Sequence, residues 1–193
     1  MSKSLRQELA ADLRAERFDL TPEGVYFPRQ SVLAAGEYFD RVNGGEWTRT
    51  PNRVVNEGMA HILNVALGAT AKPAGYFLAL FNGAASPQAN WTAASFAAAA
   101  SEIVSMTEGY TNPTRPAWTP SAASGNSIDN MAAVATVTIA TAAQVNVTGA
   151  AMLTSSGRGS TTGVLVSATR YAAERTFQNG DTYDIGYRLS LTV

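Results

Sequence analysis

The end of the chain alternates strictly between apolar and polar residues. Over the twelve residues from Thr182 to Val193, one face carries Tyr183, Ile185, Tyr187, Leu189, Leu191 and Val193. A period of two over this length is typical of a strand with one buried face and one face in water. We therefore expect a long antiparallel strand here.

Shorter apolar or alternating runs precede it from residue 75 onward. They cover residues 75–83, 134–140, 144–153 and 163–171. Turn signals separate them, such as Asn82-Gly83 after the first run. Several short strands at this spacing predict a mainly β fold, namely an antiparallel β-sandwich or jelly-roll.

Two segments of this domain carry helix signals. The first begins with Thr50 as a cap and Pro51 at the first helical position, and Gly68 stops it. The second runs through residues 92–103, with Thr92 as its cap and Phe96 facing inward. With a third helix at the start of the chain, the sequence predicts two or three helices.

The first 49 residues have a different character. Leu5, Leu9 and Leu13 form one narrow apolar stripe, which predicts a helix that docks on another surface. Residues 18–49 show no clear period and are broken by glycines and prolines. Their aromatic residues include Tyr26, Phe27, Tyr38, Phe39 and Trp47. We interpret residues 1–49 as an N-terminal helix and extended arm, anchored on its own domain or on a neighbour, and 50–193 as a β-sandwich domain with a leading helix.

Charge is distributed unevenly along the chain. Residues 1–57 hold 17 of the 29 charged side chains, whereas residues 58–157 hold only five. A free monomer usually keeps about a quarter of its residues charged. The weakly charged block suits a subunit packed among neighbours, and a neutral, hydroxyl-covered monomer is the alternative.

Composition narrows the classes of function. The net charge of −1 provides no basic excess for nucleic-acid binding, and the lack of cysteine excludes disulfides and thiol chemistry. The first nineteen residues are charged and lack the apolar core of a signal peptide, and the longest apolar run is too short to span a membrane. We expect a protein that is made and folded in a cytoplasm.

Candidate catalytic groups are few. His61, the only histidine, lies inside a predicted helix, where a packed or surface role is far more common than catalysis. Asp181 and Asp184 flank a strand start and suit a turn better than a carboxylate pair or a calcium site. The glycine-rich segment 155–163 contains Arg158 but lacks the ending of a phosphate loop, so we predict a mobile hairpin tip. We expect no enzyme activity, cofactor or metal.

The segment from Gly109 to Pro120 combines two aromatic residues, an arginine and three prolines. The prolines stiffen its backbone. Tyr110, Arg115 and Trp118 suit three roles, which the sequence leaves open. They brace the fold from inside, contact another subunit, where these residue types concentrate, or stack on a sugar.

The order of motifs from residue 50 resembles a known group of proteins. It runs from "NRVVNEGMAHILNVAL" and "YFLALFNG" through the "RPAW" loop and "GVLVSATRY" to "NGDTYDIGYRLSLTV". The resemblance is to small virion structural proteins of tailed bacteriophages and covers residues 50–193. These are packing and turn motifs, so no catalytic residue is carried over.

The resemblance implies a β-sandwich module with an arm that belongs to the virion. It implies a capsid decoration (cement) protein that binds the major capsid protein and other virion subunits and self-associates as a dimer or trimer. The alternative is a tail or fibre component that acts as an adaptor or binds a host glycan. Neither role involves nucleic acid or a membrane.

Overall fold

The computed structural model describes residues 18–20, 22, 26–28 and 33–192. The chain divides into a smaller unit, Met1–Leu33 with Thr192–Val193, and a larger unit, Ala34–Leu191. In the smaller unit, β1 (Phe18–Leu20) pairs antiparallel with β2 (Tyr26–Pro28). The predicted stripe of Leu5, Leu9 and Leu13 lies outside the described residues.

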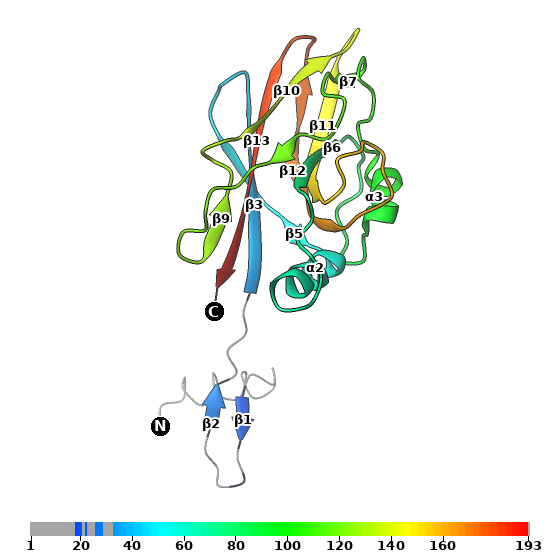
Figure 1. Cartoon of the computed structure of the whole chain (residues 1–193). Helices are drawn as coiled ribbons and strands as arrows, with labels where there is room; N and C mark the ends of the chain where they lie inside the picture. The colour runs from blue at the N-terminus through cyan, green and yellow to red at the C-terminus, as the bar shows by residue number, and fades with distance from the viewer. Residues whose placement is uncertain (1–17, 21, 23–25, 29–32, 193) are drawn as a thin grey trace. The chain divides into compact units, whose positions relative to one another are not determined.

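Six strands of the larger unit form its first sheet (Figure 1). Five follow in the spatial order β4 (Thr48–Pro51), β3 (Leu33–Val42), β13 (Thr182–Thr192), β10 (Ala135–Ala140) and β7 (Gly109–Tyr110). The sixth, β9 (Ser127–Asp129), pairs with the far half of β13 through Arg188↔Asp129 and Ser190↔Ser127. The strand with the strictest alternation in the sequence therefore lies inside this sheet.

Five strands form the second sheet. Their spatial order is β5 (Arg53–Val54), β12 (Leu165–Phe177), β11 (Val145–Leu153), β6 (Tyr76–Phe81) and β8 (Ala117–Trp118). The pairs β5–β12, β12–β11, β11–β6 and β6–β8 are all antiparallel. The predicted mainly β fold with antiparallel sheets is confirmed.

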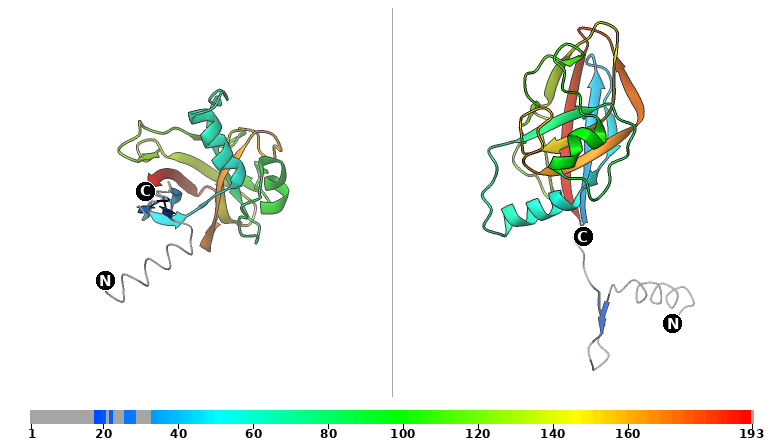
Figure 2. Two further views of the ribbon diagram at one scale, coloured as in Figure 1. Left: turned by 90° about the horizontal axis from the view of Figure 1, so that it is seen from below. Right: turned by 90° about the vertical axis from the view of Figure 1, so that its right-hand side faces the viewer.

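Two apolar clusters explain the burial patterns of the strands. The larger one joins residues of both sheets, including Leu78 and Val137. The smaller one, around Phe81 and Phe96, joins the second sheet to α3 (Ala93–Ala100), which lies over that sheet in the right-hand view of Figure 2. Strand β10 is covered on one face and alternates between buried and exposed residues, whereas β11 is buried at every position from Gly149 to Leu153.

The helices agree with the predictions in part. Thr92 caps α3 as expected, in a reciprocal capping box with Ser95. The leading helix α2 covers Asn56–Ala66 and begins after Val55, not at Thr50. Thr50 and Pro51 belong instead to β4, because pairing with β3 outweighs their helix-start signals. No helix among the described residues is long and apolar enough to cross a bilayer.

The larger unit begins well before the predicted boundary at residue 50. Strand β3 carries Tyr38 and Phe39 into the interior, where both side chains are fully buried. Trp47, in the following turn, is half-buried and lies under the guanidinium of Arg41 at 4.5 Å. These three residues of the predicted arm thus pack on their own domain. For Tyr26 and Phe27 the structure describes the pairing of β2 with β1.

Candidate binding pocket

The proline-rich segment 109–120 leads from β7 to β8, and its three candidate residues face inward. Tyr110, Arg115 and Trp118 are 0%, 1% and 8% exposed. Of the three roles that the sequence left open, this geometry is the one expected for an internal brace. Each of the three makes a different kind of internal contact.

Arg115 forms a buried ion pair with Glu102. Its Nε and Nη2 atoms each donate to one carboxylate oxygen at 2.7 Å, and both side chains are completely buried. Arg115 Nη1 also donates to the carbonyl of Ser155 at 2.9 Å, and the Gly159 N–H donates to Glu102 at 3.0 Å. The pair therefore ties the proline-rich segment to the glycine-rich segment 155–163.

Arg158 makes a second tie between these segments. Its guanidinium donates to four backbone carbonyls, those of Ile103, Ser105, Tyr110 and Asn112, at 2.6–3.3 Å. It also lies 3.8 Å from the centre of the Tyr110 ring. Burial lowers the pKa of Arg158 and raises the pKa of Tyr110 to about 12. The segment that was predicted to be a mobile hairpin tip is therefore anchored to the domain by Arg158.

Trp118 links the two sheets. Its Nε1 atom donates to the carbonyl of Tyr187 on β13 at 3.0 Å. Its ring packs edge-on against Tyr76 at 5.9 Å and against Tyr187 at 6.1 Å between centroids. This aromatic group forms one wall of a pocket.

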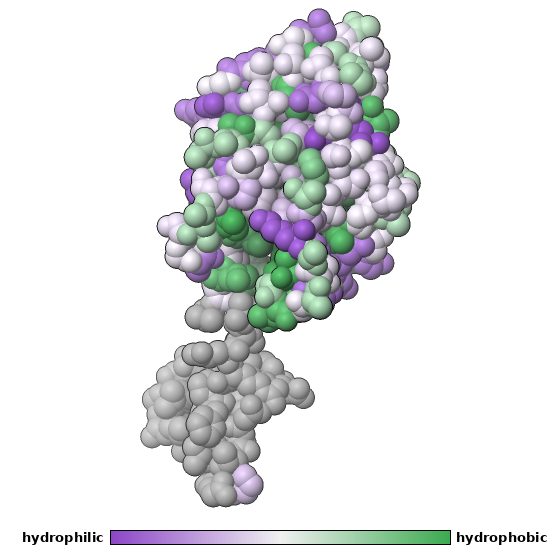
Figure 3. Space-filling model, viewed as in Figure 1, coloured by the Kyte–Doolittle hydropathy of each residue, from purple (hydrophilic) through white to green (hydrophobic). Residues whose placement is uncertain are grey.

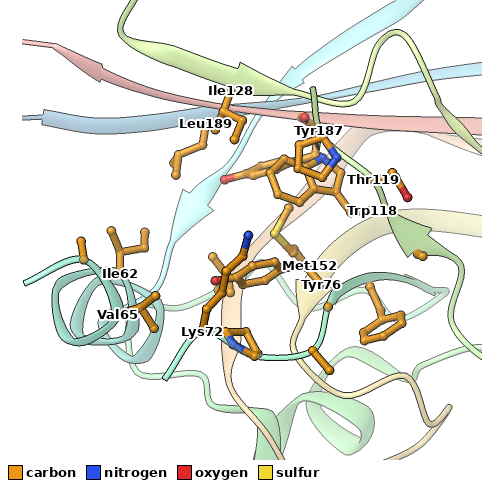
Figure 4. Close-up of a pocket in the computed structure, with 18 residues that line it drawn as sticks. Ile62, Val65, Lys72, Tyr76, Trp118, Thr119, Ile128, Met152, Tyr187 and Leu189 are labelled. Atoms are coloured by element: carbon orange, nitrogen blue, oxygen red, sulfur yellow. Dashed lines mark hydrogen bonds between the residues drawn. The ribbon is translucent and has the colours of Figure 1, made fainter. Parts of the chain in front are cut away.

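The pocket has a volume of about 550 Å³ and lies between α2 and strands of both sheets. Figure 4 shows its lining, and Figure 3 shows hydrophobic residues gathered around a hollow beside α2. The main apolar side chains are Ile62, Val65, Trp118, Met152, Tyr187 and Leu189. They come from distant parts of the chain, so the pocket exists only in the folded domain.

The polar atoms of the aromatic walls already have partners. Tyr76 Oη is 3.1 Å from Nε2 of His61, and Tyr187 Oη accepts from Nδ2 of Asn52 at 3.1 Å. The Trp118 N–H donates to the Tyr187 carbonyl. His61 is buried, and this burial lowers its pKa. The walls consequently offer a ligand mainly carbon surface.

Lys72 is the one charged residue that lines the pocket. Lys72 is exposed, and Figure 4 shows its side chain extending from the loop before β6 among the other lining side chains. Within the described parts of the chain, no salt bridge involves Lys72. The pocket thus combines apolar walls with a single amine at its mouth, which is the usual composition of a small-molecule site.

The acidic residues that sequence reasoning considered for chemistry have structural partners. Asp184 pairs with Arg41 at 2.6 Å. Asp181 accepts hydrogen bonds from the Gln178 N–H and from Asn43 Nδ2, which lowers its pKa and closes the turn before β13. Within residues 33–192 and the shorter described segments, no group of three or more acidic or histidine residues is arranged to hold a metal ion.

Sequence reasoning did not find the pocket. A signal was present, because Lys72 is one of only five charged residues between 58 and 157. The other four do not line the pocket, so an isolated charge does not by itself locate the site. Trp118 and Leu189 line the same pocket but lie far from Lys72 in the sequence. No helix or strand periodicity relates residues at such separations.

The sequence matches no protein-family model. A comparison with curated proteins also finds no significant match. The function is therefore inferred from the residues of this chain.

Proposed function

We propose that this protein is a non-enzymatic structural protein of a bacteriophage virion, namely a capsid decoration or cement protein that clamps neighbouring capsid subunits. In this proposal its two antiparallel sheets form a β-sandwich of the jelly-roll type. Its partners are the major capsid protein and further copies of itself, as a dimer or trimer. The support comes from the surface formed by residues 58–157.

That surface carries even less charge than the sequence suggests. Of the five charged side chains in this block, Glu102 and Arg115 are completely buried against each other. Only Lys72, Glu108 and Asp129 remain to charge the surface of a 100-residue stretch. The centres of protein interfaces are depleted in charge in the same way, and this is the observation that favours assembly.

Apolar side chains are exposed in the same block. Met59 and Leu63 lie on α2, and Leu67, the residue that caps its C-terminal end, is 84% exposed. Val104 and Met106, after α3, are about half exposed. Removing such side chains from water against a neighbour contributes about 25 cal/mol per Å² of apolar surface, before the entropic cost of association. The surface of α2 is therefore the first candidate for the contact with a capsid subunit.

The test compares phage particles with the protein, without it, and with Leu63→Asp protein. Asn64→Asp is the matched control, because it adds the same charge to an exposed neighbouring position of α2. We expect particles without the protein, or with the Leu63→Asp variant, to release DNA at a lower temperature than wild-type particles. Particles with the Asn64→Asp variant should behave as wild type.

Normal resistance to heat and chelators in particles that lack the protein would overturn the capsid role. Immunogold labelling then separates the head from the tail. Label at the tail would instead favour the alternative, a tail or fibre component that acts as an adaptor or binds a host glycan. A glycan array without hits would then exclude the glycan-binding form of this alternative.

A further inference from the structure

We propose that the pocket beside α2 binds an amphipathic carboxylate of the fatty-acid class, with its hydrocarbon chain inside and its carboxylate at Lys72. This activity goes beyond the assembly role and does not depend on it. Three properties of the pocket support it: its size, the state of its polar atoms and the position of its charge.

The size suits a small molecule. A volume of about 550 Å³ lies within the roughly 300–1,000 Å³ typical of ligand pockets. Apolar cavities of only about 150 Å³ already bind benzene. The pocket also opens to the surface, where Lys72 and Thr119 are exposed, so a ligand can enter without unfolding the domain.

The walls favour a hydrocarbon over a polar ligand. The hydrogen-bonding atoms of Tyr76, Trp118 and Tyr187 are paired with His61, the Tyr187 carbonyl and Asn52. A sugar placed here would bury hydroxyl groups against atoms that are already paired, and unsatisfied buried hydroxyl groups are unfavourable. A hydrocarbon chain has no such groups, and each methylene that it buries strengthens binding.

The charge at the mouth selects the head group. Lys72 contributes the only charge of the lining, and its amine is a compact point charge that pairs with a single anionic group. One carboxylate balances it, while the chain behind the carboxylate follows the apolar walls. An uncharged alcohol of the same length would fill the same walls but would not gain the pairing with Lys72.

Isothermal titration calorimetry with dodecanoate, below its micelle concentration, tests this on the full chain. We expect one dodecanoate to bind per chain. Lys72→Met should weaken dodecanoate binding at least tenfold, because methionine keeps most of the aliphatic stem of the side chain but carries no charge. Arg170→Met is the matched control: it removes the same charge from an exposed position on β12 that does not line the pocket, and it should leave the dissociation constant within twofold.

Dodecanol separates the contribution of the charge from that of the walls. It should bind wild type and Lys72→Met equally. Ala66→Trp, which introduces a large ring at an exposed lining position, should abolish the binding of both ligands. Circular dichroism confirms that each variant is folded.

Three results would overturn the proposal. They are the absence of dodecanoate binding to wild type, equal weakening by Lys72→Met and Arg170→Met, and unchanged binding by Ala66→Trp. In the first case the apolar side chain of a protein partner becomes the better candidate occupant. None of these results bears on the heat resistance of phage particles, so failure here is distinct from failure of the assembly role.

Discussion

Arg115 and Glu102 face each other through two hydrogen bonds of 2.7 Å at a site where neither side chain is exposed. They are 13 positions apart in the chain and lie where the proline-rich segment meets the end of α3. Their contact also fixes Gly159 in the glycine-rich segment. Three loops therefore depend on one pair of side chains.

Removing one partner of this pair should be strongly destabilising. Arg115→Met leaves the Glu102 carboxylate buried without a counter-charge, and such losses cost about 3–5 kcal/mol. Urea denaturation followed by circular dichroism measures the change in the free energy of unfolding. The double variant Arg115→Met with Glu102→Leu should recover much of the loss, because no unpaired charge remains. A loss below about 1 kcal/mol in the single variant would contradict this account.

Arg158→Lys should loosen the glycine-rich segment without unfolding the domain. A lysine amine cannot reach the four carbonyls that Arg158 bonds, nor stack in the same way on the Tyr110 ring. We expect a loss of about 2 kcal/mol and faster amide hydrogen exchange across residues 155–163. Arg170→Lys, at an exposed position, serves as the control. Equal exchange rates in the two variants would speak against an anchoring role.

For Gly58→Ala, the sign of the change in the free energy of unfolding tests how closely α2 packs on β12. Alanine is a better helix former than glycine by about 1 kcal/mol, so at a free helix surface this change stabilises. In α2, however, a Cβ atom at Gly58 would lie 2.7 Å from the Cα of Val166 on β12. We expect a net loss of about 1–3 kcal/mol from the resulting displacement of α2, measured by thermal or urea unfolding. A gain in stability would show that α2 does not pack this closely on β12.

His61 should make stability depend on pH between about 5 and 7.5. Burial lowers its pKa in the folded protein, whereas an unfolded histidine titrates near about 6.5. The unfolded chain thus binds the proton first as the pH falls. The contribution to stability is complete above about pH 7 and is lost as the pH falls through 6.5 toward the folded pKa.

His61→Gln isolates this effect, because glutamine still reaches the Tyr76 hydroxyl but does not titrate. The free energy of unfolding should fall less between pH 7.5 and pH 5 in the variant than in wild type. The pKa values of Asp129 and Asp181 are lowered too, mainly by backbone N–H donors, but their effect lies below about pH 5. Identical pH dependence in the two proteins would exclude His61 as the source.

The strands that were predicted correctly carry either a continuous apolar run, as β6 does, or an alternating pattern, as β10 does. Strand β10 alternates because one face meets the core between the sheets. Strand β3 was not predicted, because several of its side chains pack against charged residues. Asp40 is buried against Arg175 of β12 at 2.7 Å, and the guanidinium groups of Arg49 and Arg188 lie about 5 Å from the Phe39 ring. A strand that packs its polar residues inward shows no hydrophobic period.

The sequence also did not predict that the side chains of the proline-rich segment point into the domain. Tryptophan and arginine occur both on binding surfaces and in buried positions. The residue types of Trp118 and Arg115 therefore did not show whether their side chains face the core or the solvent. The partners that turn them inward, Tyr187 and Glu102, lie 69 and 13 positions away. Pairings over such separations follow from the sheet topology, which the local pattern does not contain.

The burial of Glu102 against Arg115 has a kinetic consequence for any partner that binds the surface of residues 58–157. With three charged side chains left there, long-range attraction adds little to the encounter. Association is then expected at the roughly 10⁵–10⁶ M⁻¹s⁻¹ of neutral pairs, with little sensitivity to ionic strength. A tight complex with this part of the surface must accordingly owe its lifetime to slow dissociation.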